Sequence, residues 1–193
     1  MNKELINREL QEAGKYLRQF IIDENNINNI EMAASLMITA LKSGNKIISC
    51  GNGGSMCDAM HFAEELSGRF RNNRKALAAV SISDPSHLTC VGNDYGFDYV
   101  FSRYIEALGK KGDVLLAIST SGSSPNIINA AITAKDKEIT IVALTGKNGG
   151  RLAQLSDVEV RAPFSEYSDR TQEIHIKVIH TIISLIEYEL SDG

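Results

Sequence analysis

Short apolar runs rich in β-branched residues alternate with helical patterns along most of this chain, and this alternation restricts its fold more than any other feature. The runs cover residues 46–50, 77–82, 113–119, 140–145 and 158–162. Buried parallel strands have this length and composition. Strands that are separated by helices pair in parallel, with helices on both faces of the sheet. The sequence therefore predicts an α/β fold with a five-stranded parallel sheet.

Two amphipathic helices are predicted before the first strand, and one long helix from about Asp169 to Leu190 after the last. The first should run from about Lys3 to Asp23, and the second should begin at an N-cap, Asn25 or Asn26. Two helices are more than one side of a small sheet needs. Their spare apolar surface either packs in the core or contacts other subunits, and the sequence favours neither reading.

The length of 193 residues suits one domain. We expect residues 1–44 to serve packing and oligomerisation, and residues 45–193 to form the α/β core with the C-terminal helix.

Charge and cysteine content exclude some classes of protein. The net charge of −4 argues against nucleic acid as a partner, because phosphate neutralisation needs a basic face. Three cysteines without CxxC spacing fit a reduced, cytoplasmic protein. The chain begins with charged residues, so no signal peptide is expected. No apolar run approaches the roughly 18 residues of a membrane span, so no membrane partner is expected.

A glycine-rich turn, Gly51-Asn52-Gly53-Gly54-Ser55, joins the first predicted strand to a helix. Glycines let backbone amides approach a ligand closely, because no Cβ stands in the way. The amides and the dipole at a helix N-terminus both favour an anion. The turn is therefore a candidate binding loop.

A second loop, residues 119–124, carries five hydroxyl side chains in six residues, broken only by Gly122. It also opens a predicted helix, with Ser124 as N-cap and Pro125 at the first helical position. A capping turn needs one or two hydroxyls, so the surplus favours a phosphate cradle. Neither GxxxxGK[ST] nor GxGxxG occurs, which argues against a nucleotide P-loop and a dinucleotide site. Both loops follow strands, at the edge where parallel sheets bind ligands.

His61 and Glu65 lie one helical turn apart, so their side chains can meet at one point. Such a pair can share a divalent metal or place a carboxylate base beside an imidazole; it can equally be a surface pair. His180 stands in an apolar helix, where a packed histidine is at least as common as a functional one. Gln172 and His180 are separated by about 12 Å along a straight helix, so one copy cannot easily direct both to one metal.

Other polar residues carry weaker signals. His87 and His175 suit capping or packing. Asn93 and Asp94 follow Gly92 in a segment that could hold sugar hydroxyls or form a turn. The basic cluster of residues 69–75 has the composition of a solvated face, although Arg69 could reach a neighbouring site.

Four segments together resemble the bacterial phosphoheptose isomerases of the SIS (sugar isomerase) family. They are residues 50–55, 57–66, 119–122 and 172–180. The likeness covers nearly the whole chain. It implies a flavodoxin-like three-layer α/β/α fold (the SIS domain), with extra N-terminal helices. It also implies a homotetramer with active sites between subunits, and a cytoplasmic role in making ADP-heptose for the lipopolysaccharide core.

The resemblance also implies roles for residues. Glu65 matches the base and His180 the acid of an aldose–ketose isomerase that acts on sedoheptulose 7-phosphate through an enediol. One Zn²⁺ per subunit is implied, with ligands at His61, Glu65, Gln172 and His180. The matched substrate-binding residues are Asn52, Gly53, Gly54, Ser55, Asn93, Asp94, Ser119, Thr120, Ser121, Ser124 and Gln172.

The 12 Å estimate predicts that at least one zinc ligand on the last helix comes from another chain. A carboxylate that binds zinc tightly is a weaker base, so the two roles of Glu65 compete.

Two other functions are compatible with this family. One is a non-catalytic SIS protein that binds the replication initiator; such proteins lack counterparts of Glu65 and His180. The other is a sugar-phosphate-sensing module, which is usually fused to a DNA-binding domain for which no residues remain here. The sequence therefore favours the enzyme.

Overall fold

The computed structural model describes residues 2–190. Within them, five strands form one sheet in the order β2-β1-β3-β4-β5, and every neighbouring pair is parallel. This confirms the predicted five-stranded parallel sheet, and the order is that of flavodoxin-like folds. The strands are β1 (Ile47–Gly51), β2 (Ala79–Ser81), β3 (Val114–Ser119), β4 (Thr140–Thr145) and β5 (Val158–Arg161).

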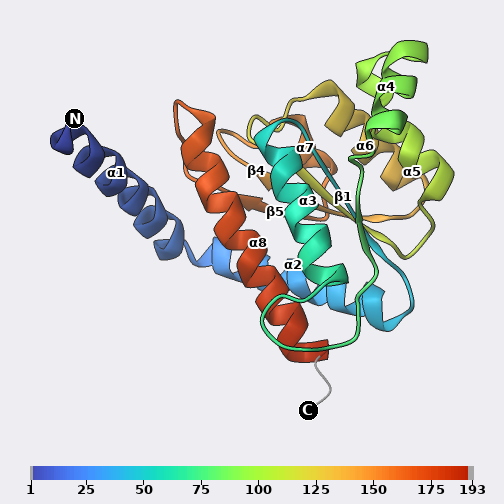
Figure 1. Ribbon diagram of the computed structural model, residues 1–193, viewed down its shortest axis with the longest axis horizontal. Helices are drawn as coiled ribbons and strands as arrows, with labels where there is room; N and C mark the ends of the chain where they lie inside the picture. Colours follow the sequence, from blue (N-terminus) through green and yellow to red (C-terminus); the bar gives the residue numbers. More distant parts are fainter. Residues whose placement is uncertain (1, 191–193) are drawn as a thin grey trace.

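Helices cover both faces of the sheet, which gives the three layers seen in Figure 1. They are α1 (Lys3–Ile22), α2 (Glu24–Lys42), α3 (Gly54–Ser67), α4 (Pro85–Asp94), α5 (Ser102–Leu108), α6 (Pro125–Asp136), α7 (Gly150–Leu155) and α8 (Ser168–Leu190), with a 3₁₀ turn at Phe97–Tyr99. Alternate strand residues enter opposite cores, as the two-residue period of a strand requires. Leu116 and Ile118 pack with α2, α3 and α8, whereas Leu115 and Ala117 pack with α5 and α6.

The structure corrects one predicted helix start and adds short elements that were not predicted. The second helix begins at Glu24 with Asp23 as its N-cap, not at Asn25 or Asn26; the Asp23 carboxylate accepts a hydrogen bond from the backbone amide of Asn25. The segment before β3 forms a 3₁₀ turn followed by α5. Helix α7 was not predicted, because six residues are too few to show a helical period.

Helix α4 begins with a side-chain cap and a proline in its first turn. The Asp84 carboxylate accepts from the backbone amide of His87, and Pro85 occupies the first turn. Between residues 2 and 190, no helix combines the length and hydropathy that a membrane-spanning segment requires.

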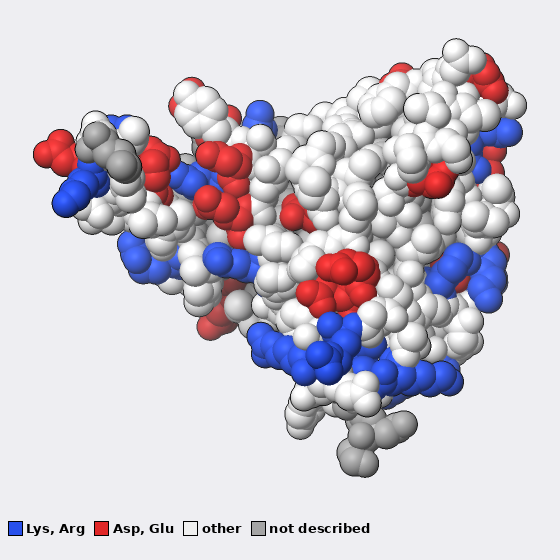
Figure 2. Space-filling view, in the orientation of Figure 1, with Lys and Arg blue, Asp and Glu red and all other residues white. Residues whose placement is uncertain are grey.

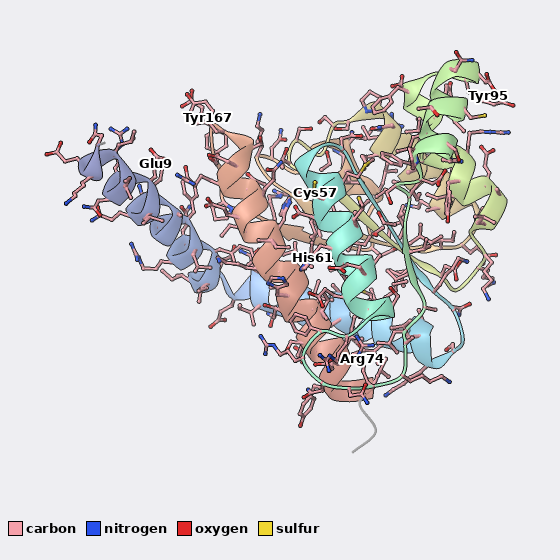
Figure 3. The ribbon with its side chains drawn as sticks, viewed as in Figure 1. Glu9, Cys57, His61, Arg74, Tyr95 and Tyr167 are labelled. Carbon is pink, nitrogen blue, oxygen red and sulfur yellow. The ribbon has the colours of Figure 1, made fainter. Side chains whose placement is uncertain are left out.

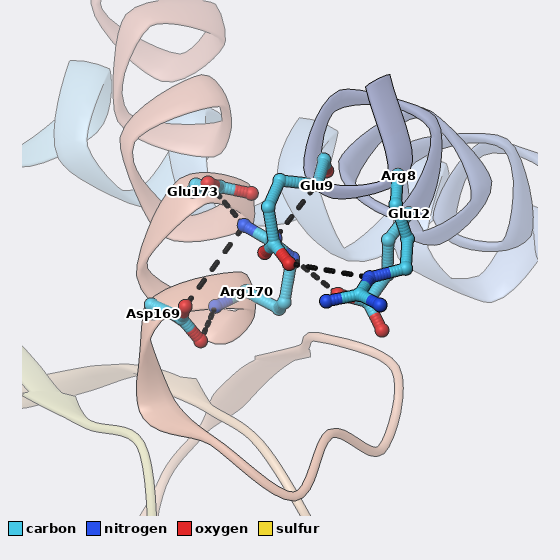
Figure 4. Close-up of polar contacts among 6 residues, drawn as sticks. All are labelled: Arg8, Glu9, Glu12, Asp169, Arg170 and Glu173. Atoms are coloured by element: carbon cyan, nitrogen blue, oxygen red, sulfur yellow. Dashed lines mark hydrogen bonds and ion pairs between the residues drawn. The ribbon is translucent and has the colours of Figure 1, made fainter. Parts of the chain in front are cut away.

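Helix α1 extends away from the rest of the protein, beside α8 (Figure 1). Phe20 is its only buried residue, and Leu10 and Ile22 are among its exposed apolar side chains. Phe20 and Leu17 pack against the core, and the Arg170 guanidinium on α8 contacts the carboxylates of Glu9 at 2.6 Å and Glu12 at 3.1 Å (Figure 4). The helix thus contacts the rest of the protein through apolar packing and ion pairs, and it leaves other apolar side chains exposed.

Candidate active site

A cavity of about 300 Å³ lies at the carboxyl ends of β1 and β3, where the two predicted loops meet. It brings together eight predicted residues: Asn52, Gly53, Gly54, Ser55, Ser119, Thr120, Ser124 and Gln172. Ile118 and Ser168 complete the lining. Ser168 was missed, because only the fold brings the start of α8 to this edge of the sheet. Ser121, Asn93 and Asp94 do not line the cavity.

Asn93 and Asp94 lie in the last turn of α4, where the Asn93 amide donates to the Asp94 carboxylate at 2.8 Å. Both are exposed, and this hydrogen bond joins them only to each other. Their role in binding sugar hydroxyls therefore stays a prediction.

Two glycines shape the loop after β1. Gly53 has φ of 55°, a conformation that glycine adopts without steric cost. A Cβ on Gly54 would lie 2.7 Å from Nε2 of Gln172, so the Gln172 amide lies against the backbone of α3 and would have to shift for any larger residue. The amino end of α3 thus opens directly onto the cavity and onto the Gln172 amide.

The hydroxyl loop divides its side chains between two tasks. The Ser121 hydroxyl accepts from the Ser123 backbone amide at 3.2 Å, and the Ser123 hydroxyl donates to the Ser121 carbonyl. These two residues stabilise the turn itself. Ser119 and Ser124 instead face the cavity with their hydroxyl oxygens 3.3 Å apart, and Ser124 makes no capping bond to its helix. Three of the five hydroxyls, those of Ser119, Thr120 and Ser124, therefore remain for a ligand.

His61 and His180 meet between α3 and α8, where the two helices lie side by side (Figure 3). Their Nε2 atoms are 2.9 Å apart, so one ring donates a proton and the other accepts it. Glu65 Oε1 is 3.5 Å from His61 Nε2. Glu64 Oε1 contacts the other ring nitrogen of His61 at 3.0 Å from a side chain that is 68% exposed, against 20% for Glu65. Of the two adjacent carboxylates, that of Glu64 therefore faces solvent.

The surroundings of His180 favour its neutral form. Burial lowers its pKa and the neighbouring His61 lowers it further, while Glu65 acts in the opposite direction. A neutral imidazole can donate a proton from one nitrogen and accept one at the other. His180 is therefore suited to proton exchange with a bound molecule near neutral pH.

The two zinc ligands that were predicted on α8, Gln172 and His180, lie apart in the structure. His180 reaches His61 within one chain, whereas Gln172 lies beside Gly54 at the cavity. His61, Glu64 and Glu65 form a group whose ligand atoms lie within 4.8 Å of one another. His180 is not in that group, but its Nε2 lies 2.9 Å from Nε2 of His61. Imidazole nitrogens and carboxylate oxygens are ligands that zinc binds, so His61, Glu65 and His180 fit a zinc ion.

Three further residues near the site were not predicted, or were interpreted wrongly, from the sequence. Asn126, buried at the start of α6, forms a reciprocal amide pair with Asn52 of the glycine loop. Asp58, one turn before His61, is half-buried, and burial raises its pKa to about 6. Arg74 belongs to the basic cluster that was interpreted as a solvated face, yet its side chain is 2% exposed.

Arg69, Arg71 and Lys75 of that cluster are exposed, as expected. Figure 2 shows Lys and Arg gathered near the ends of α3 and α8, below an acidic patch.

A larger cavity, about 510 Å³, lies between the α1–α2 junction and β5. None of the predicted site residues lines it. We therefore place the candidate active site at the smaller cavity and the neighbouring His61–His180 cluster.

Comparisons with known proteins identify the family of this chain. The SIS domain family model matches residues 10–146. Phosphoheptose isomerases from Glaesserella parasuis and Tolumonas auensis are 58% and 61% identical to this chain over 191 residues, covering 99% of it and 100% of each relative. The structure of a phosphoheptose isomerase from Neisseria gonorrhoeae has a TM-score of 0.90 at 39% identity, covering 96% of this chain and 98% of that one. The Francisella tularensis enzyme gives 0.91 at 34% identity, covering 97% and 100%. The chain therefore belongs to the phosphoheptose isomerases of the SIS domain family.

Proposed function

We propose that this chain converts sedoheptulose 7-phosphate to D-glycero-D-manno-heptose 7-phosphate, the first step of ADP-heptose biosynthesis for the lipopolysaccharide core. One observation carries the proposal beyond family membership. Helix α3 connects a hydroxyl-lined cavity at its amino end to the cluster of His61, Glu65 and His180 further along. A heptose 7-phosphate carries its phosphate at one end and its reacting carbons at the other, which suits a site with these two parts.

The cavity suits the phosphate end. Hydroxyls of Ser119, Thr120 and Ser124 face it, and both α3 and α6 begin beside it. Helix amino ends supply free amides and a partial positive charge for an anion. Gly54 and Gln172 close the side toward α8.

Glu65 and His180 supply the proton chemistry. Glu65 removes a proton from C1 of the ketose, and the electron pair forms the C1–C2 double bond of an enediol. His180 donates a proton to the oxygen on C2. Glu65 then returns a proton to C2 while His180 takes one from the oxygen on C1, which leaves the aldose and restores both side chains.

We further propose one zinc ion per subunit, held by His61, Glu65 and His180, with Gln172 as the fourth ligand. Zinc would polarise the substrate carbonyl when bound. Because Gln172 lies beside Gly54, its participation requires either a shift of its side chain or its arrival from another copy.

We also propose a cytoplasmic homotetramer with active sites between subunits. Residues 1–44 would form its packing and oligomerisation segment within a single domain of residues 1–193, of which residues 1 and 191–193 lie outside the described part. The exposed apolar face of α1 supports this assembly. The three cysteines are all free, which suits a reducing compartment.

The test is to incubate the protein with sedoheptulose 7-phosphate and follow formation of the aldose by NMR. We expect product with the wild-type chain and none with Glu65→Gln. Absence of product from folded wild-type protein would refute the isomerase proposal. That result would still be compatible with a non-catalytic protein that binds sugar phosphates. The contacts that bring Glu65 and His180 together at His61 argue against such a protein.

A further inference from the structure

A buried ion pair joins the loop after α3 to the last turns of α8. The side chains of Arg74 and Glu187 are 2% and 3% exposed, and Arg74 Nε lies 3.4 Å from Glu187 Oε1. Figure 3 shows Arg74 at the ends of both helices, below His61. The pair lies outside the cavity and outside the His61–His180 cluster, so neither residue has a role in the mechanism above.

The guanidinium of Arg74 caps α3 at a residue of the site. Its Nη2 donates to the backbone carbonyl of Glu65 at 2.8 Å, and its Nη1 donates to that of Leu66 at 2.9 Å. The last carbonyls of a helix have no partner within the helix. Arg74 therefore fixes the backbone at the position from which the Glu65 carboxylate extends toward His61.

The carboxylate of Glu187 holds the loop that leads to Arg74. It accepts from the backbone amides of Arg71 and Asn72 at 3.4 and 3.3 Å, and from the Asn72 side chain at 3.2 Å. Glu187 is seven residues, or about two helical turns, beyond His180, so both side chains point from the same face of α8 toward α3. In Figure 1 the loop passes around this end of α8.

The same loop covers His180. The Phe70 ring lies 5.8 Å from the His180 ring, and the Arg71 guanidinium lies 4.9 Å from the centre of the Phe70 ring. Movement of the loop would therefore change the packing of His180 as well as the end of α3.

We propose that Arg74 and Glu187 are positioning residues for isomerisation: they hold Glu65 on α3 and His180 on α8 at one separation. The inference rests on the proposed function. Replacement of a buried ion pair by apolar side chains of similar volume is often neutral for stability. The presence of a charged pair here is explained by its hydrogen bonds to the Glu65 carbonyl and to the loop amides, which apolar side chains cannot make.

The test is the double variant Arg74→Met/Glu187→Leu, assayed with sedoheptulose 7-phosphate. Both charges leave together, so no unpaired buried charge remains to unfold the chain. We expect kcat to fall by at least about 10-fold, because small displacements of reacting groups are costly. KM should stay within about 3-fold, because the residues that line the cavity are unchanged.

A matched control is Lys111→Met/Glu138→Gln, which removes an exposed pair with Nζ and Oε2 2.7 Å apart. It should leave kcat and KM unchanged. Arg74→Lys is the second variant: it keeps the charge opposite Glu187 but cannot reach both carbonyls, so its kcat should also fall at constant KM.

The positioning role would be overturned if a folded variant of either kind kept the wild-type kcat. It would also be overturned if KM rose by the same factor by which kcat fell. If the double variant does not fold, the kcat of the Arg74→Lys variant tests the positioning role by itself. Activity of the wild-type chain in the same assay separates this outcome from failure of the proposed function.

Discussion

Asn52 and Asn126 exchange two amide hydrogen bonds although they lie 74 residues apart in the chain. Asn52 Nδ2 donates to Asn126 Oδ1 at 2.9 Å, and Asn126 Nδ2 donates to Asn52 Oδ1 at 2.8 Å. The Asn126 oxygen also accepts from the Ile127 backbone amide, which fixes its orientation. This pair ties the glycine loop, which lines the cavity, to the first turn of α6.

Replacement of Asn126 by leucine should weaken substrate binding. The variant loses both bonds and leaves the Asn52 amide without its partner, which costs about 1–2 kcal/mol. We expect KM to rise about 10-fold with kcat within about 3-fold, measured with sedoheptulose 7-phosphate. Asn129→Leu, one turn further along α6, removes an amide that bonds to the Asp98 carbonyl instead. It serves as the control and should leave KM unchanged.

Glu65→Gln should abolish turnover while the protein still folds and binds sugar phosphate. Glutamine keeps the shape of the side chain but cannot take the proton from carbon, and loss of a general base costs about 10²- to 10⁴-fold in rate. Turnover by NMR and sugar-phosphate affinity by calorimetry measure the two properties separately. Glu138→Gln is the control, because it changes an exposed carboxylate that pairs with Lys111 outside the His61–His180 cluster. Substantial activity of the Glu65 variant would remove Glu65 from the mechanism.

Chelation should remove activity, and added zinc should restore it. Elemental analysis of the wild-type protein is expected to find one zinc per chain. His180→Ala and His61→Ala should each lower this content, because each removes one of the two converging imidazoles. His87→Ala should not, because its Nε2 bonds to the Val100 carbonyl away from the cluster. Turnover that persists after the zinc has been removed would contradict an essential metal.

Protonation of His175 should destabilise the fold in acid. The side chain is fully buried, and this burial lowers its pKa from 6.5 to about 4, although a bond to the Thr145 carbonyl opposes the shift. The unfolded chain therefore binds a proton at higher pH than the native state does. Stability is present above pH 6.5 and falls as the pH decreases toward 4, by at most about 3 kcal/mol at 1.36 kcal/mol per pKa unit.

Urea unfolding at pH 7 and pH 4.5 measures this loss. His175→Gln can keep the bond to Thr145 and cannot titrate, so the difference between its unfolding free energies at the two pH values should be smaller than in the wild type. An equal pH dependence in both proteins would show that His175 does not contribute.

Local patterns predicted most of the secondary structure. The strand that contains Leu115 and Leu116 is recognisable because its apolar run is short, includes Val114 and Ile118, and is bounded by turn residues. The Asp84-Pro85 start of α4 is likewise local, since cap and first turn are adjacent in the chain. Helix α7 could not be predicted, because its six residues show no periodic pattern and only Leu152 among them is buried.

The alternation of strands and helices by itself determined the sheet and its parallel pairing, and the two loops of glycine and hydroxyl residues predicted the edge at which a ligand would bind. Neighbours in sequence set backbone conformation, so these features could be read directly. Only the tertiary structure decided that His180 meets His61 across 119 residues, that Gln172 faces Gly54, and that Arg74 is buried. Contacts between helices depend on how whole helix faces pack against each other, and the spacing of residues along the chain does not predict which side chains then meet.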